Sequence, residues 1–381
     1  MAARLLLACA LGATALSGFH PGRGAAEEYR WSLPKGFPKP RVPVGNPTSE
    51  SKARLGRYLF YDERLSVNGT QACASCHRQE LAFTNGSAMP RGATGQAHPR
   101  RAISLVNVAY SAVLTWSNPN LRSLEEQALI PMFSEHPVEL GLRGREKSLV
   151  GLLRSDPVYR ELFRMAFADS KAPFTVVNVA KALASFERTI ISARSPYDRY
   201  HFGGDQNAIS QSAQRGEALF FADQFGGCFR CHGGFNFSDA TDYESSRQTP
   251  VEFHNTGLYN LPGKFSYPLP SLGIFEHTGK PGDIGKFKAP SLRNVELTAP
   301  YMHDGSIATL EEVLDHYAAG GRTISDGPYA GRGHDNPNKD ARLTGIGFTA
   351  QNRADLLAFL RSLTDTDVLH DARFANPWQR D

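Results

Sequence analysis

Two copies of one five-residue pattern constrain this chain more than any other feature of its sequence. The pattern Cys-x-x-Cys-His occurs at residues 73–77 and again at residues 228–232. On a short helix its two sulfurs and its imidazole share one face, so two thioether bonds and one Fe–N bond can reach a single porphyrin. Each copy therefore predicts a covalently attached c-type haem. The predicted attachment residues and iron ligands are Cys73, Cys76 and His77 for the first haem, and Cys228, Cys231 and His232 for the second.

Zinc sites and redox dithiols also use paired cysteines. A zinc site normally closes within one small module, whereas these two pairs lie far apart in the sequence. Neither zinc binding nor dithiol chemistry explains a histidine directly after both pairs. The two copies use every cysteine except Cys9. We therefore expect two haems, with no cysteine left for a disulfide in the mature chain.

The composition is that of a globular protein with room for two domains. The chain has 381 residues, of which 41% are hydrophobic and 21% are charged. Its formal net charge is only +4, and no block of Lys and Arg with interleaved aromatic residues occurs. The sequence therefore gives no indication of a nucleic-acid surface.

The N-terminus has the pattern of a secretory signal peptide. A short basic start is followed by an apolar run that is too short to span a bilayer, and we expect cleavage between Ala15 and Ala26. Residues 6–9 have some lipobox character, but the apolar run before Cys9 is very short, which favours simple secretion. The prediction for residues 1–26 is thus a signal peptide, and the mature chain is expected in the periplasm without a transmembrane segment. Thioether attachment of this type takes place outside the bacterial cytoplasm, which agrees with export.

The remaining chain is predicted to be mainly α-helical, with two cytochrome-c-like domains. Five prolines in residues 27–47 indicate an extended N-terminal strap. An N-terminal haem domain is expected over 48–205 and a C-terminal haem domain over 206–381. Apolar periodicity predicts a helix from an N-cap at Thr48 to about Phe60, and further helices over 122–130, 146–154, 175–193, 309–319 and 350–363.

A weak internal repeat supports two related domains. Residues 55–60 precede the first haem motif as residues 215–220 precede the second, and each reads as an amphipathic helix leading into a haem loop. Residues 234–290 are rich in Gly, Pro and aromatic residues without periodicity. They predict a long loop over the second haem.

Beyond the haem motifs, the chain resembles the bacterial dihaem cytochrome c peroxidase and MauG superfamily. The similarity runs over residues 52–363, through Gly-Arg-Tyr-Leu-Phe-Tyr-Asp-Glu-Arg-Leu-Ser at 56–66 and Pro-Ser-Leu-Arg-Asn-Val-Glu-Leu-Thr-Ala-Pro-Tyr-Met-His-Asp-Gly at 290–305. The resemblance implies two haems that face each other across a domain interface, one reacting with peroxide. Residues 317–324 and 326–331 look most like the MbnH-type branch of MauG-like enzymes.

The resemblance also implies roles opposite the two irons. Where peroxidases of the family place a Met ligand to the second iron, five residues after a Thr-Leu-Glu-Glu motif, this chain has Tyr317. An anionic phenolate stabilises Fe(III) and higher states, so Tyr317 is expected to ligate the second haem iron as in MauG-like enzymes. Over the open face of the first haem the match places Gln127, Pro131 and Glu139, with Glu139 as the acid/base. Glu135 competes for this role because the loop is two residues longer than in the simplest peroxidases, and His136 offers an alternative iron ligand.

Two further expectations rest on the same resemblance. Trp116 matches the tryptophan between the haems and is expected to relay electrons. Calcium is expected between the domains through the backbone oxygens of Thr298 and Pro300. However, Arg101 stands at the position of the third ligand, an Asn, and a guanidinium cannot replace it. Asn107 is a conceivable substitute.

The functional hypothesis is a periplasmic oxidoreductase that uses H₂O₂ to form a high-valent dihaem species. The oxidant then acts at a distance on an aromatic residue of a partner protein. In the MbnH-type branch the partner is copper-associated and its Trp is converted to kynurenine. The alternatives are a dihaem peroxidase that takes electrons from a small cytochrome c or cupredoxin, and an electron-transfer dihaem cytochrome without peroxide chemistry.

Overall fold

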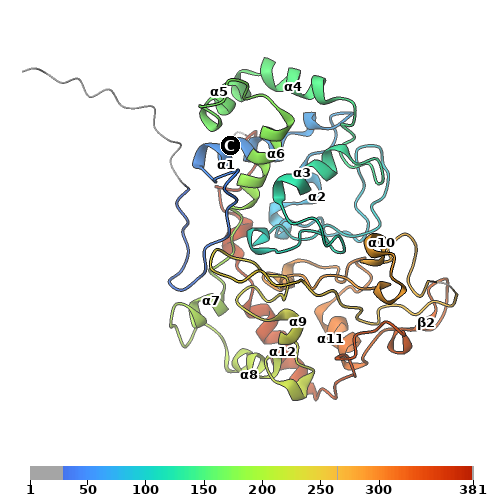
Figure 1. The fold of residues 1–381 in the computed structure, drawn as a ribbon. Coiled ribbons are helices and arrows are strands. Elements are labelled where there is room, and N and C mark those ends of the chain that lie inside the picture. Colours follow the sequence, from blue (N-terminus) through green and yellow to red (C-terminus); the bar gives the residue numbers. More distant parts are fainter. Residues whose placement is uncertain (1–28, 264, 380–381) are drawn as a thin grey trace, which may run out of the picture.

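A computed structural model describes residues 29–263 and 265–379, and it confirms a mainly helical fold (Figure 1). In the described residues the only strands are β1 (Thr323–Ile324) and β2 (Gly331–Arg332), which pair antiparallel. The predicted signal peptide and Cys9 lie outside these residues. The longer helices are α1 (Glu50–Phe60), α3 (Leu124–Phe133), α4 (Glu146–Ser155), α5 (Pro157–Ala166), α6 (Val176–Glu187), α7 (Pro196–His201), α8 (Gln211–Phe220), α11 (Leu310–Ala318) and α12 (Ala350–Ser362).

Two helical lobes repeat one packing arrangement. In the first lobe α1 packs on α6, and in the second α8 packs on α12. The contact is made at equivalent glycines, Gly56 and Gly216. A Cβ on Gly56 would lie 1.9 Å from the carbonyl oxygen of Ala182, and one on Gly216 would lie 2.0 Å from that of Asp355. The weak sequence repeat therefore corresponds to a repeated helix crossing in which the backbones touch.

Replacing Gly216 by Ala is expected to destabilise the holoprotein by about 1–3 kcal/mol, because the new methyl group overlaps backbone and forces the two helices apart. Chemical denaturation followed by helix content measures this loss. Gly151 in α4 is the matched control, since a Cβ there meets nothing within 4 Å and Ala favours a helix by about 1 kcal/mol over Gly. Equal stability of the two variants would contradict the proposed helix contact.

Most predicted helices are confirmed, and the structure corrects three details. The N-cap of α1 is Ser49 rather than Thr48, because the Ser49 side chain accepts a hydrogen bond from the backbone of Lys52. The helix predicted over 175–193 ends at Glu187. Helix α5 was not predicted, although Asp156 caps it and Pro157 begins it, which is a standard start signal.

Some segments of the chain contribute to the hydrophobic core of the other lobe. Val368 and Phe374 belong to the hydrophobic core of the first lobe, so the C-terminal segment returns to α1 (Figure 1). Conversely, Trp116 and Tyr197 belong to the core of the second lobe. The division of the chain at 205/206 remains a prediction, and these contacts show that the two cores exchange segments.

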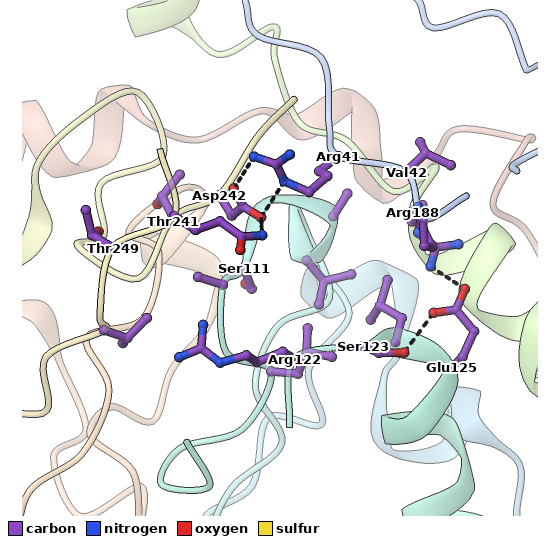
Figure 2. Close-up of a pocket in the computed structure, with 18 of the residues that line it drawn as sticks. Arg41, Val42, Ser111, Arg122, Ser123, Glu125, Arg188, Thr241, Asp242 and Thr249 are labelled. Carbon is purple, nitrogen blue, oxygen red and sulfur yellow. Dashed lines mark hydrogen bonds and ion pairs between the residues drawn. The ribbon is translucent and has the colours of Figure 1, made fainter. Parts of the chain in front are cut away.

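Residues 29–48 contain no helix or strand and run between the lobes as a strap. Arg41 of this strap is held by Asp242 of the second lobe, with Nε to Oδ2 at 2.8 Å and Nη2 to Oδ1 at 3.0 Å. A cavity lies beside this ion pair, and it is lined by the strap and by both lobes (Figure 2). None of the predicted haem-binding residues lines it. No helix in the described part of the chain is long and apolar enough to cross a membrane.

Candidate dihaem site

The first Cys-x-x-Cys-His motif forms the short helix α2 (Cys73–Cys76), with His77 at its C-terminal end. Nδ1 of His77 lies 3.0 Å from the carbonyl oxygen of Phe83. Phe83 has a left-handed backbone with φ of 58°, uncommon for a residue with a side chain. A histidine whose Nδ1 donates to a carbonyl has its Nε2 available for a metal, so the ring is fixed in the tautomer suited to an axial ligand.

The second motif repeats this arrangement at α9 (Phe229–His232). Nδ1 of His232 lies 3.2 Å from the carbonyl oxygen of Phe237 and 3.1 Å from that of Pro290. Phe237 also has a positive φ, of 50°. Both histidines are therefore oriented by a contact between Nδ1 and a nearby backbone carbonyl oxygen, and His232 has a second such contact.

A largely apolar cavity in the second lobe brings together the residues expected to hold the second haem. Cys228, Cys231, His232 and Tyr317 all line it. Tyr317 lies on α11, whose start is fixed by a capping box between Thr309 and Glu312. This set supplies two sulfurs, an imidazole and a phenol around one cavity, which is the donor set that a c-type haem with an anionic second ligand requires.

The two cysteine motifs thus fit covalent haem. Burial raises the pKa of the Tyr317 phenol, so its phenolate form needs a cation close to the oxygen. A ferric iron bound by His232 would be that cation.

Glu139 lies beside the first motif. Its charge contributes to raising the pKa values of the Cys73 and Cys76 thiols, which are raised first by burial. Burial also raises the pKa of Glu139 itself to about 7. The loop is held in place because the backbone carbonyl of Glu139 accepts a hydrogen bond from Ala93 at 2.7 Å. A carboxyl with a pKa near neutrality is suited to both accepting and returning a proton.

The two competitors in the same loop are exposed. Glu135 makes a loose ion pair with Arg143 at 3.4 Å, with side chains that are 57% and 66% exposed respectively. His136 is also exposed. Of the three candidates, Glu139 alone combines partial burial with proximity to the first haem motif.

Gln127 and Pro131 lie one helical turn apart on α3, and both are half-buried. The carbonyl oxygen of Pro131 accepts a hydrogen bond from the backbone of Leu140 at 2.9 Å, directly after Glu139. The end of α3 therefore positions the Glu139 loop.

Trp116 is buried, lines the second cavity and is fixed at both its ring and its backbone. Its Nε1 donates to the carbonyl oxygen of Arg101 at 3.0 Å. Its own carbonyl accepts from the backbone of Lys288 at 2.8 Å. The indole therefore has one fixed orientation in the wall of the second cavity.

The residues expected to bind calcium do not fit this ion. The buried guanidinium of Arg101 donates to the carbonyl oxygen of Thr298, which is one of the expected ligands. Burial lowers the pKa of Arg101 to about 10, so the group is still a cation at neutral pH. The side chain of Asn107 is engaged with the backbone of Ser192, because its Oδ1 accepts at 2.7 Å and its Nδ2 donates at 3.0 Å. Near Thr298 and Pro300 the chain supplies a positive charge rather than a third oxygen ligand.

We expect calcium removal to have no effect on this protein. Extensive washing with EGTA, followed by addition of Ca²⁺, should leave the haem spectra and the rate of reaction with H₂O₂ unchanged. The reason is that the Arg101 guanidinium already donates a hydrogen bond to the carbonyl oxygen of Thr298. Elemental analysis should find no retained calcium. Stoichiometric calcium together with a calcium-dependent rate would contradict the interpretation of Arg101.

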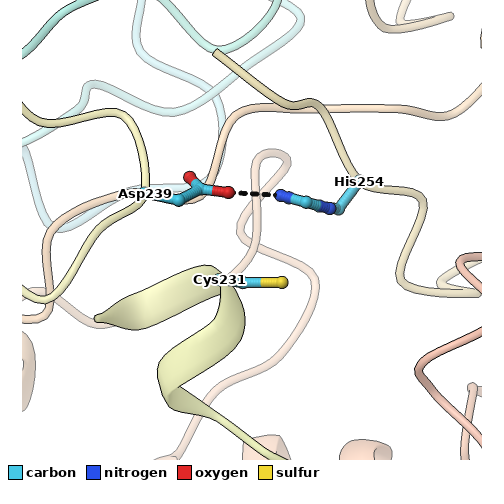
Figure 3. Close-up of side chains that lie close together, drawn as sticks. All are labelled: Cys231, Asp239 and His254. Carbon is cyan, nitrogen blue, oxygen red and sulfur yellow. Dashed lines mark hydrogen bonds and ion pairs between the residues drawn. The ribbon is translucent and has the colours of Figure 1, made fainter. Parts of the chain in front are cut away.

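His254 lies beside the second motif and was not predicted from the sequence (Figure 3). Its Nε2 is 2.6 Å from Asp239 and its Nδ1 is 2.9 Å from Asp340. Burial opposes its charged form, but the hydrogen bonds to Asp239 and Asp340 raise the pKa of His254 above its usual value. Cys231 has a predicted thioether bond, and both imidazole nitrogens are engaged, so the group is a buried cation beside the haem cavity rather than a metal site.

Glu187, at the end of α6, was also missed. It is buried, its Oε2 has no hydrogen-bond partner within the described residues, and burial raises its pKa to about 8. Its charge acts on Cys73. The sequence signal was a carboxylate at the end of an otherwise apolar helix face.

Comparison with known proteins identifies the family of this chain. The model of the di-haem cytochrome c peroxidase family matches residues 50–207. The cytochrome-c peroxidase IdrP1 of Denitromonas iodatirespirans is 35% identical over 97% of this chain and 94% of its own length. The methylamine utilization protein MauG of Methylorubrum extorquens is 32% identical over 93% of this chain and 89% of its own.

A solved structure extends this similarity to the fold. The crystal structure of a MauG-like protein associated with microbial copper homeostasis superposes with a TM-score of 0.89 at 46% identity, covering 92% of this chain and 100% of that one. The family implies two haems and a peroxidase-type oxidoreductase. The chain belongs to the di-haem cytochrome c peroxidase family and is a MauG-like member of it.

Proposed function

We propose that this protein uses H₂O₂ to oxidise an aromatic residue, a tryptophan converted to kynurenine, on a partner protein associated with copper in the periplasm. The observation that carries this proposal is Tyr317, which lines the cavity of Cys228, Cys231 and His232 where peroxidases of the family place a Met. The similarity to a MauG-like protein associated with copper homeostasis supports the choice of partner. Export by the N-terminal signal is part of the proposal.

In this proposal each motif holds one haem. Cys73, Cys76 and His77 bind the first, and Cys228, Cys231, His232 and Tyr317 bind the second. When bound, the haems supply the reduction of peroxide and the storage of its two oxidising equivalents. The protein positions them and excludes water, as the apolar lining of the second cavity indicates.

The residues of the first site move protons. Glu139, with a pKa near 7, takes a proton from the bound peroxide and returns it to the leaving oxygen. Pro131 holds the Glu139 loop through Leu140, and Gln127 lies one turn before Pro131 on the same helix. Trp116 relays electrons between the two haems in this proposal, and its Nε1 proton is held by the carbonyl oxygen of Arg101.

Mass spectrometry of partner proteins tests the proposal. The holoprotein is incubated with H₂O₂ and with exported proteins encoded beside it, and the partners are searched for a tryptophan that has gained one oxygen and lost one carbon. No such product in any partner would contradict partner oxidation.

A peroxidase with a small electron carrier is the second candidate, because several relatives are named as cytochrome c peroxidases. Its signature is fast, repeated turnover of H₂O₂ with a reduced cytochrome c or cupredoxin. Such turnover with unmodified partners would favour this candidate over partner oxidation.

A further inference from the structure

Three tyrosines form a row from the second cavity to the protein surface. Tyr267 is buried and lines the cavity together with His232 and Tyr317. The ring of Tyr259 lies 5.5 Å from that of Tyr267, and the ring of Tyr329 lies 5.7 Å from that of Tyr259, as measured between ring centroids. These spacings are those of aromatic rings in direct contact. The row is therefore continuous from the cavity to its last member.

Tyr329 reaches solvent, and it differs in this from the other tyrosines. The side chain of Tyr329 is 48% exposed. The structure describes all the other tyrosines as well, and each of them is buried or half-buried. It belongs to the turn between β1 and β2. Tyr329 lies in the stretch 326–331, which resembles the MbnH-type branch and to which the proposed function gives no role.

The turn is fixed against the segment that carries Tyr259. A Cβ on Gly331 would lie 2.2 Å from the carbonyl oxygen of Asn260, so the two backbones are in contact. Nδ2 of Asn336 donates to the carbonyl oxygen of Tyr259 at 2.8 Å. The turn that carries Tyr329 and the segment that carries Tyr259 are thus held against each other by their backbones.

The two inner tyrosines have partners for their phenolic protons. The Tyr259 hydroxyl donates to Oδ2 of Asp304 at 2.6 Å, and the Tyr267 hydroxyl donates to Oδ1 of Asn255 at 2.8 Å. Burial opposes ionisation of Asp304, but His303, Tyr259 and Ser306 outweigh it and lower its pKa, so Asp304 is a carboxylate. A phenol loses an electron far more easily when its proton can move to a base, and Asp304 is such a base for Tyr259.

We propose that Tyr329, Tyr259 and Tyr267 form the path by which electrons pass from an aromatic residue of the docked partner to the second haem site, with Tyr329 as the point of contact. This inference rests on the proposed function and adds the exit residue. In each turnover the partner's ring loses two electrons in single steps, and H₂O₂ with two protons gains them to form water. When Tyr259 gives up an electron its proton moves to Asp304, and the proton returns when Tyr259 is reduced.

The test uses the holoprotein and H₂O₂ without a partner, so that no partner residue supplies electrons to the path. In the native protein, excess H₂O₂ should modify Tyr329, either by oxygen addition or by a covalent dityrosine dimer, as detected by peptide mass spectrometry. Tyr259→Phe keeps the ring but has no proton to give to Asp304. It should abolish the modification of Tyr329 and slow the decay of the oxidised haem spectrum roughly tenfold or more.

Tyr243→Phe is the matched control. Tyr243 is half-buried, and its ring contacts Phe235 at 5.6 Å rather than any member of the row. This variant should behave as the native protein. Modification of Tyr329 that persists in Tyr259→Phe, or a native Tyr329 that stays unmodified, would overturn the path.

Formation of the oxidised spectrum is scored separately from its decay. Absence of that spectrum in the native protein would contradict the proposed function, whereas normal formation with an unchanged decay in Tyr259→Phe contradicts only the path. The two failures are therefore distinguishable in one set of experiments.

Discussion

Replacement of Glu139 by Gln is expected to slow the reaction of the ferric holoprotein with H₂O₂ by roughly 10²-fold or more, the usual contribution of a positioned acid/base. The amide keeps the size of the side chain but cannot take a proton from peroxide. Stopped-flow absorbance after mixing with stoichiometric H₂O₂ measures the rate. Glu135→Gln is the control, and this exposed residue should be replaceable without effect.

The pH dependence gives a second readout for Glu139. Burial raises its pKa to about 7, and the carboxylate is the form that accepts a proton. The native rate should therefore rise as pH increases through about 7, and the rise should be absent in Glu139→Gln. A rise that remains in Glu139→Gln but disappears in Glu187→Gln would assign the role to Glu187, whose pKa is raised to about 8.

The same shift predicts a stability difference. Because the folded-state pKa of Glu139 lies above its unfolded value, its contribution to stability is fully present below the unfolded pKa and is lost as pH rises through about 7. Glu139→Gln does not titrate, so between weakly acidic and alkaline pH it should lose less stability than the native protein. Denaturant midpoints at several pH values measure this difference.

Replacement of Tyr317 by Met is expected to raise the reduction potential of the second haem and to abolish oxidation of the partner. A thioether favours Fe(II), whereas a phenolate favours Fe(III) and higher states. Axial ligands set haem potentials over about 0.8 V, so a shift on the order of 0.1 V or more is expected. A redox titration followed by absorbance measures the potential.

A second tyrosine in the same cavity provides the control for Tyr317. Tyr301 also lines the cavity, and its hydroxyl donates only to the carbonyl of Glu296 at 3.4 Å. Tyr301→Phe should leave the potential unchanged. If Tyr317→Met leaves both the potential and the peroxide reaction as they are, Tyr317 is not an iron ligand.

Features encoded by neighbouring residues could be predicted from the sequence. The haem motifs place all their donors within five residues, and a single helical turn brings those donors together. Helices α1, α8 and α12 carry their apolar faces and caps in contiguous segments. The MauG-like resemblance likewise rests on contiguous stretches, and the comparisons confirm the family.

Features that depend on residues far apart in the sequence needed the tertiary structure. The sequence left Glu139, Glu135 and His136 as alternatives, because spacing along a loop does not say which side chain turns inward. Packing of the loop against Ala93 and α3 distinguishes them.

The surroundings of charged residues also depend on contacts between distant parts of the sequence. Sequence put Arg101 at the position of a calcium ligand, but only the fold shows that its guanidinium meets the carbonyl of Thr298, nearly two hundred residues away. The position of His254 between Asp239 and Asp340 could not be predicted either, because these three residues are far apart in the sequence.

The sequence by itself therefore determined the cofactor chemistry, the helical class and the family, because each is written in short contiguous patterns. Only the tertiary structure shows which carboxyl is partly buried and has a pKa near neutrality, and which cation lies near Thr298. It also shows that Tyr267, Tyr259 and Tyr329 form one row. Burial and ring contact are properties of neighbours in space, and a linear sequence does not specify those neighbours until the chain has folded.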